Sequence, residues 1–79
     1  MAIKIYPNPT FDQFTLGIEI KNKEDLSLKI YDVIGKLIST EKIYQNDQKI
    51  NVDKLNNGVY WIEVQSSNWT EKEQLLIQR

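Results

Sequence analysis

The stretch Gly58-Val59-Tyr60-Trp61-Ile62-Glu63-Val64-Gln65 carries the clearest structural signal in the chain. Apolar side chains stand at Tyr60, Ile62 and Val64, and the positions between them are mixed. Successive side chains of a strand point to opposite faces, so this period of two predicts a strand with one face on a core. A slip of one residue would turn the apolar row toward water, which fixes the register. The stretch therefore predicts an antiparallel sheet that is buried on one side.

The same period recurs before and after this stretch. Turn residues separate the runs about every 8–12 residues, and no amphipathic helix of ordinary length intervenes. We therefore predict one all-β domain over residues 1–79, an immunoglobulin-like antiparallel β-sandwich of about seven strands. The expected strands are 3–6, 14–20, 26–31, 36–44, 49–53, 59–65 and 71–78.

Two of these segments carry signs of a sheet edge. Tyr6-Pro7-Asn8-Pro9 ends the first strand, because each proline lacks an N–H and biases its predecessor toward an extended conformation. Such a strand is expected at an edge or at a crossing between sheets. The segment 36–44 alternates poorly, since Leu37 and Ile38 are adjacent. It is predicted to be an edge strand or to carry a bulge.

Turn-forming residues separate the strands. Asp32-Val33-Ile34-Gly35 is typical of a type I turn, with Asp32 hydrogen-bonding back to the chain and Gly35 in the left-handed region. Gly58, after two asparagines, needs a positive φ. Further predictions are a polar hairpin loop over 21–25, a turn over 66–69, one helical turn over 53–55 capped by Asp53, and core or corner positions for Tyr6, Tyr31 and Tyr60.

Composition excludes several classes of function. The chain has 79 residues, 10 basic and 11 acidic side chains, a net charge of −1, and neither cysteine nor histidine. Disulfides, thiolate metal sites and the commonest general base are therefore absent. The charges form no stripe for nucleic acid. The apolar runs are far shorter than the ~20 residues that span a bilayer, so membrane insertion is not expected.

No catalytic or metal-binding constellation is visible. The serines at 27, 39, 66 and 67 have no histidine to activate them. The carboxylates are dispersed among turns and outward strand positions, and Asp32 is better explained as a turn former. Oxygen-bearing side chains near Asp47 and Asp53 lack the regular spacing of a calcium loop. We expect no enzyme, no metal and no cofactor.

The two tryptophans suggest one alternative function. Alternation places Trp61 on the face opposite Tyr60, and Trp69 falls at a turn. Exposed tryptophans on a sandwich can stack on a sugar or contact a partner protein. The alternative function is therefore that of an immunoglobulin-like binding or adhesion module. The competing structural interpretation is that both rings cover the edges of a small core.

Four motifs in order resemble a known family. They are Tyr6-Pro7-Asn8-Pro9, then Ile30-Tyr31-Asp32 with Gly35, then Leu55 ahead of Gly58-Val59-Tyr60, then Lys72 with the ending Leu75-Leu76-Ile77-Gln78-Arg79. Together they cover nearly the whole chain and resemble the C-terminal sorting domain (type A) of the bacterial type IX secretion system. Glu71, Glu73 and Gln74 make the last strand less basic than in many members.

The resemblance implies a role as an address on secreted cargo. Such cargo passes through the periplasm and reaches the cell surface or the extracellular space. The implied partners are translocon and shuttle proteins at the outer membrane and a surface sortase that cuts upstream of the domain. Met1-Ala2, directly ahead of a strand pattern, is expected to be an addition at the boundary of a module taken from a longer protein.

The last strand is the hypothesised recognition element. A terminal strand can offer unpaired backbone groups and alternating side chains for strand addition by a receptor. Its apolar residues are also expected to fill the core, so truncation would damage folding and recognition together. Isolated copies are expected to pair weakly through open strand edges. The candidate recognition residues are Lys72, Leu75, Leu76, Ile77, Gln78 and Arg79.

Overall fold

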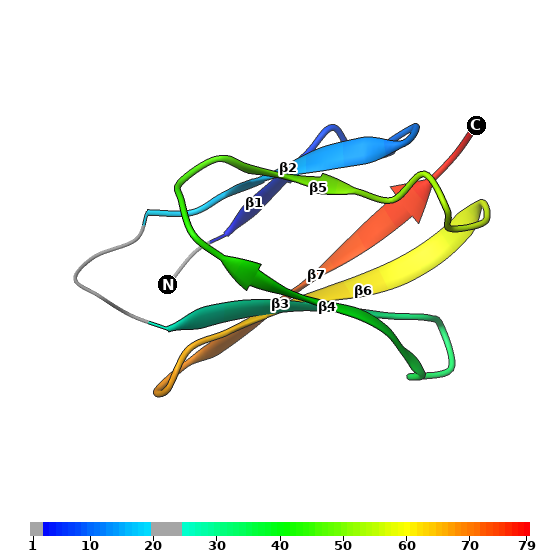
Figure 1. The fold of residues 1–79 in the computed structure, drawn as a ribbon. Coiled ribbons are helices and arrows are strands. Elements are labelled where there is room, and N and C mark those ends of the chain that lie inside the picture. The colour runs from blue at the N-terminus through cyan, green and yellow to red at the C-terminus, as the bar shows by residue number, and fades with distance from the viewer. Residues whose placement is uncertain (1–2, 20–24) are drawn as a thin grey trace.

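The computed structural model describes residues 3–19 and 25–79, and in this part of the chain all regular structure is β. The strands form two antiparallel sheets, ordered β1-β2-β5 and β4-β3-β6-β7, which lie as two layers (Figure 1). The predicted all-β sandwich is confirmed. The strands are β1 (Lys4–Tyr6), β2 (Gln13–Gly17), β3 (Leu26–Tyr31), β4 (Leu37–Ile43), β5 (Gln48–Asn51), β6 (Gly58–Gln65) and β7 (Thr70–Ile77).

The core lies between the two sheets and follows the predicted alternation. In β6 the inward row of Tyr60, Ile62 and Val64 is buried. Full burial of an aliphatic or phenyl side chain contributes about 1.5–3 kcal/mol, so these rows supply most of the stabilising free energy. The remaining buried apolar residues are Ile5, Phe14, Leu16, Ile18, Leu26, Leu28, Ile30, Ile43, Ile50, Val52, Leu75 and Ile77.

Strand bounds differ from the predictions by a few residues. The predicted strand 14–20 ends earlier, because β2 stops at Gly17, although Ile18 beyond it is still buried. The predicted strand 49–53 also stops early, with β5 ending at Asn51. Ile20, most of the predicted loop 21–25, and Met1-Ala2 lie outside the described residues.

Both edge predictions are confirmed. β1 lies at one edge of the three-stranded sheet, and β4 lies at one edge of the four-stranded sheet. The register between β3 and β4 shifts, so that Ile30 faces Ser39 whereas Tyr31 faces Leu37. Ile38 is therefore an extra residue in β4, which is the expected bulge.

The predicted turn between β3 and β4 is confirmed in detail. The N–H of Gly35 donates to the carbonyl of Asp32 over 3.0 Å, and Gly35 has a φ of +89°. Asp32 Oδ1 accepts hydrogen bonds from the backbone N–H groups of Ile34 (3.0 Å) and Lys36 (2.9 Å). The side chain of Asp32 therefore holds the turn closed, as its sequence position indicated.

The other two predicted turns also form. Gly58 begins β6 with a φ of +151°, as its position after two asparagines predicted. Between β6 and β7, Ser66 N–H donates to the carbonyl of Trp69 over 2.9 Å. The Ser66 hydroxyl oxygen accepts from the N–H groups of Asn68 and Trp69, each over 3.2 Å.

The predicted helical turn at 53–55 is wrong. The segment is a single turn in which Leu55 N–H donates to the carbonyl of Val52 over 3.0 Å. Its polar partner is Asn51, whose Oδ1 accepts from Asp53 N–H over 2.9 Å. An asparagine that bonds the N–H two residues ahead closes a turn by itself, and the sequence reasoning assigned that part to Asp53.

Of the three tyrosines, Tyr60 fits its prediction. It is buried, and its hydroxyl donates over 2.7 Å to the carbonyl of Asn56, an arrangement known as a tyrosine corner in immunoglobulin-like sandwiches. The prediction is wrong for Tyr6 and Tyr31. Alternation turns both rings to the outer faces of their sheets, where Tyr6 is 41% exposed and Tyr31 is half-buried.

Candidate functional site in the last strand

β7 is one of the two edge strands of the four-stranded sheet, opposite β4, and pairs with β6 along its whole length. Its register runs from Thr70 opposite Gln65 to Ile77 opposite Gly58. Leu75 and Ile77 point inward and are buried in the core. The expectation that the apolar end of this strand fills the core is therefore confirmed.

The outer edge of the second half of β7 is closed by Asn8. Asn8 Nδ2 donates to the carbonyl of Gln74 over 2.7 Å, and Asn8 Oδ1 accepts from Leu76 N–H over 3.0 Å. A carboxamide offers one acceptor and donors in a plane, much as a peptide group does. Its side chain therefore occupies the place of a neighbouring strand, although 66 residues separate Asn8 from Gln74.

Thr10 continues this closure with its backbone. Its N–H donates to the carbonyl of Leu76 over 2.8 Å, and its carbonyl accepts from Gln78 N–H over 2.9 Å. Thr10 is buried, and its hydroxyl donates to the carbonyl of Gln13 at the start of β2. The Tyr6–Pro7 and Asn8–Pro9 peptide bonds, which flank Asn8, are both cis. The first motif of the sequence and its last strand are therefore one structural unit.

Arg79 fixes the end of the segment after β7. Its Nη1 donates to the carbonyl of Leu55 over 2.6 Å, and its Nη2 donates to the carbonyl of Val52 over 2.9 Å. Its backbone N–H donates to Asn57 Oδ1 over 3.2 Å. The guanidinium is thus engaged by the loop between β5 and β6, where it acts as a structural contact.

Within the described residues, no strand covers the outer edge of the first half of β7. Asn8 and Thr10 contact backbone atoms of Gln74, Leu76 and Gln78, so these alternate residues direct their N–H and C=O groups away from β6. By the same alternation, Thr70 and Lys72 direct theirs to this side. No strand of the described residues pairs with that side. Backbone groups are therefore offered to a partner at Thr70 and Lys72.

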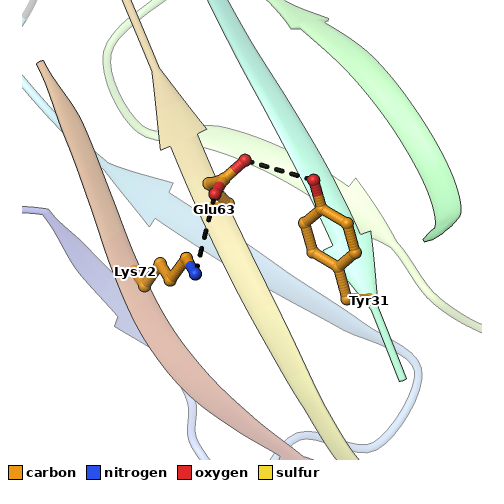
Figure 2. Close-up of polar contacts among 3 residues, drawn as sticks. All are labelled: Tyr31, Glu63 and Lys72. Carbon is orange, nitrogen blue, oxygen red and sulfur yellow. Dashed lines mark hydrogen bonds and ion pairs between the residues drawn. The ribbon is translucent and has the colours of Figure 1, made fainter. Parts of the chain in front are cut away.

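The outer face of the sheet beside this edge carries a polar row across β3, β6 and β7 (Figure 2). Glu63 Oε1 accepts from the Tyr31 hydroxyl over 3.2 Å, and its Oε2 lies 3.9 Å from Lys72 Nζ. The Glu63 side chain is 15% exposed, whereas that of Lys72 is 61% exposed. Partial burial, then the charge of Glu63 and the hydrogen bond to it, raise the pKa of Tyr31. Lys72 therefore makes one weak ion pair, and most of its side chain remains exposed to solvent.

The two tryptophans do not form one binding surface. Trp61 lies on the outer face of β6 and is 40% exposed, beside a hollow of about 300 Å³ that Tyr31 and Lys72 also line. Trp69 is half-buried and packs against the core from the turn between β6 and β7. The rings of Trp61 and Trp69 thus lie on opposite sides of the four-stranded sheet. This arrangement does not favour the alternative of a two-tryptophan binding module.

A larger hollow lies away from β7. It measures about 800 Å³ and borders β1 and β2, where the Tyr6 hydroxyl donates to Asp47 Oδ1 over 3.2 Å. Partial burial, then the charge of Asp47 and this hydrogen bond, raise the pKa of Tyr6. Across residues 3–19 and 25–79, no three acidic, histidine or cysteine side chains gather as a metal site would require. The same residues include no helix long and apolar enough to cross a membrane.

Comparison with known proteins identifies the family of this chain. Residues 4–78 match the model of the family described as the secretion system C-terminal sorting domain. The chain belongs to this family. The sorting-domain assignment made from the four motifs is therefore confirmed, and with it a type IX secretion signal from a non-catalytic family. Proteins sorted in this way are exported to the cell surface or the extracellular space and interact with the secretion machinery.

One curated relative shows the setting in which such a domain occurs. The chain is 30% identical over 70 residues to the ulvan lyase NLR42 of Nonlabens ulvanivorans. The similarity covers 85% of this chain but 12% of that protein. The sorting domain thus matches about an eighth of its relative.

The structure divides the predicted recognition residues into groups. Leu75 and Ile77 are core residues, and Arg79 is bound to carbonyls of the β5–β6 loop. Lys72 and Gln78 are exposed, and Leu76 is half-buried on the outer face. Sequence reasoning missed Asn8 and Thr10 as partners of this strand. A signal existed for Asn8, because an asparagine between two prolines has a polar side chain with no role in a strand ladder.

Proposed function

We propose that this sorting domain directs an attached cargo protein across the outer membrane through recognition of β7. The observation that carries the proposal is the position of β7 at a sheet edge, within a chain whose residues 4–78 match the sorting-domain family. An edge strand offers backbone groups that a receptor can pair with. The exposed side chains of Lys72 and Gln78 stand beside these groups.

The finer steps of the proposed pathway follow from this role. The folded domain arrives in the periplasm with its cargo and is recognised there by translocon and shuttle proteins at the outer membrane. A surface sortase then cuts upstream of the domain, which is the substrate of this cleavage. The small share of the ulvan lyase relative that this chain matches supports a role as a module on larger cargo.

A secretion assay tests the proposal. A fluorescent protein is exported to the periplasm of a host with this pathway, with residues 3–79 fused behind it. We expect fluorescence at the cell surface or in the medium, whereas the fluorescent protein with a flexible linker of equal length stays in the periplasm. Retention of the fusion in the periplasm, with the domain folded, would overturn the proposal.

A further inference from the structure

We infer that the partner of this surface is an extended strand of a receptor protein, which pairs with Thr70–Glu73, and that Asn8 sets where the pairing stops. The inference rests on the proposed sorting function and specifies the contact by which it operates. It assigns different tasks to two halves of one strand. The half before Gln74 binds the partner, and the half after it is closed by the chain itself.

The first argument is the state of the backbone groups. Strand addition requires free N–H and C=O groups on alternate residues of the edge. At Leu76 both groups are taken, because its N–H donates to Asn8 Oδ1 and its C=O accepts from Thr10 N–H. The N–H of Gln78 is also engaged by Thr10. A receptor strand therefore finds its bonding positions at Thr70 and Lys72.

The second argument is the chemistry of the side chains around the open half. Lys72 stands on the outer face with most of its side chain exposed. Glu73, one residue on, is exposed and points to the opposite face of the sheet. Opposite charges on directly facing strand residues stabilise the pair, and like charges destabilise it. The receptor strand is thus expected to carry an acidic side chain beside Lys72 and a basic one beside Glu73.

The third argument is the control of register. A strand that extended past Gln74 would have to displace the Asn8 carboxamide from the Gln74 carbonyl and from Leu76 N–H, which are bound over 2.7 and 3.0 Å. Because Asn8 is held on both sides by prolines, it presents a fixed end point. The receptor strand therefore binds in one register, which selects its sequence.

Two variants at one position test this pairing. Lys72→Pro removes the N–H on the open edge and leaves the bonds between β7 and β6, because proline is tolerated where the N–H side faces outward. Lys72→Ala removes the same side chain but keeps the N–H. In the secretion assay we expect Lys72→Pro to lower the secreted fraction about tenfold, which corresponds to about 1.4 kcal/mol of lost pairing. Lys72→Ala loses only the side-chain part of the contact, so we expect it to lower the secreted fraction much less, by about two- to threefold.

The outcomes separate this inference from the proposed function. Secretion of Lys72→Pro at the parent level overturns the inference while the sorting function stands. Retention of the parent fusion overturns both. Circular dichroism of the purified domains shows whether Lys72→Pro is folded.

A crosslinking experiment tests the contact in the unperturbed strand, even if Lys72→Pro fails to fold. A photoreactive phenylalanine at Thr70 is expected to give an adduct with an outer-membrane protein. The same residue at Lys49, an exposed strand position on the other sheet, is the matched control and should give none. Equal adducts at both positions, an adduct with a second copy of the fusion, or no adduct at Thr70 would overturn the inference.

Discussion

The two halves of β7 share one partner strand but differ in what their outer edge can do. Over Gln74–Ile77 the inward side chains are buried, and Asn8 and Thr10 occupy the outward backbone groups. Over Thr70–Glu73 the side chains are largely polar, and no strand of the described residues lies outside β7. The ladder to β6 is the same in both halves. The loop with Asn8 and Thr10, from the other end of the chain, therefore determines which half of β7 can pair with a further strand.

The largest expected effect is in the closed half. Leu75→Ala removes a fully buried side chain and should lower the free energy of unfolding by about 2–5 kcal/mol. This is a large part of the about 5–15 kcal/mol that holds a small domain together. Urea unfolding followed by circular dichroism measures it. Glu73→Ala, in the open half, is the matched control and should stay within about 0.5 kcal/mol of the parent. Equal losses of unfolding free energy in Leu75→Ala and Glu73→Ala would contradict the difference between the two halves of β7.

The next effect concerns the loop that closes the edge. Asn8→Ala removes two hydrogen bonds to β7, each worth about 0.5–1.5 kcal/mol net, so we expect a loss of about 1–3 kcal/mol in the free energy of unfolding. Asn8→Asp keeps the acceptor for Leu76 N–H but loses the donor to the Gln74 carbonyl. It should therefore also be less stable than the parent in the same urea titration. Parent-like stability of both variants would show that Asn8 does not hold the strand.

A small effect is expected for the exposed lysine of the open half. The Lys72 amine lies 3.9 Å from Glu63 Oε2 and is well exposed, and such surface ion pairs contribute about 0–1 kcal/mol. Lys72→Ala should shift the urea midpoint only slightly, and 1 M salt should leave the difference from the parent close to zero. A loss as large as that of Asn8→Ala would place Lys72 among the structural residues.

The smallest effect lies at high pH, on the outer face beside the open half. The pKa of Tyr31 is raised by partial burial and by Glu63, so the folded state keeps the phenolic proton to a higher pH than the unfolded state. This stabilisation is complete below the unfolded pKa of about 10 and is lost as pH rises through the folded pKa. Tyr31→Phe should therefore lose stability less steeply above pH 10 in urea titrations. If the free energy of unfolding fell with pH as steeply in Tyr31→Phe as in the parent, the loss of stability at high pH could not be assigned to Tyr31.

The sequence predicted most of the fold because its signals are local. Alternation fixed the inward row of β6, and turn chemistry predicted the Asp32 side-chain bonds and the positive φ at Gly35. These features depend on residues a few positions apart. The tyrosines show the limit of such reasoning. Tyr6 and Tyr31 belong to the outward rows of their strands, so alternation and not aromatic character determines where their rings lie.

The candidate site was predicted only in part because its key contacts are remote in sequence. The last strand was identified as the recognition element, and its apolar residues were expected in the core. Nothing in the local pattern of Gln74–Ile77 indicates that its edge is closed. That closure depends on Asn8 and Thr10, which the fold brings to β7 from the other end of the chain. Periodicity describes which face a residue takes, and it carries no information about what lies beside an edge.

Amide hydrogen exchange of the isolated domain, resolved by residue with NMR, tests the difference between the two halves most directly. The N–H groups of Lys72 and Leu76 both point away from β6, and among the described residues only that of Leu76 has an acceptor, which is Asn8 Oδ1. We expect Leu76 to be protected and Lys72 to exchange at close to the rate of an open chain. In Asn8→Ala, Leu76 should exchange much faster while Lys72 stays unchanged. Equal protection of the two amides in the parent domain would contradict the division of β7 into a closed half and an open one.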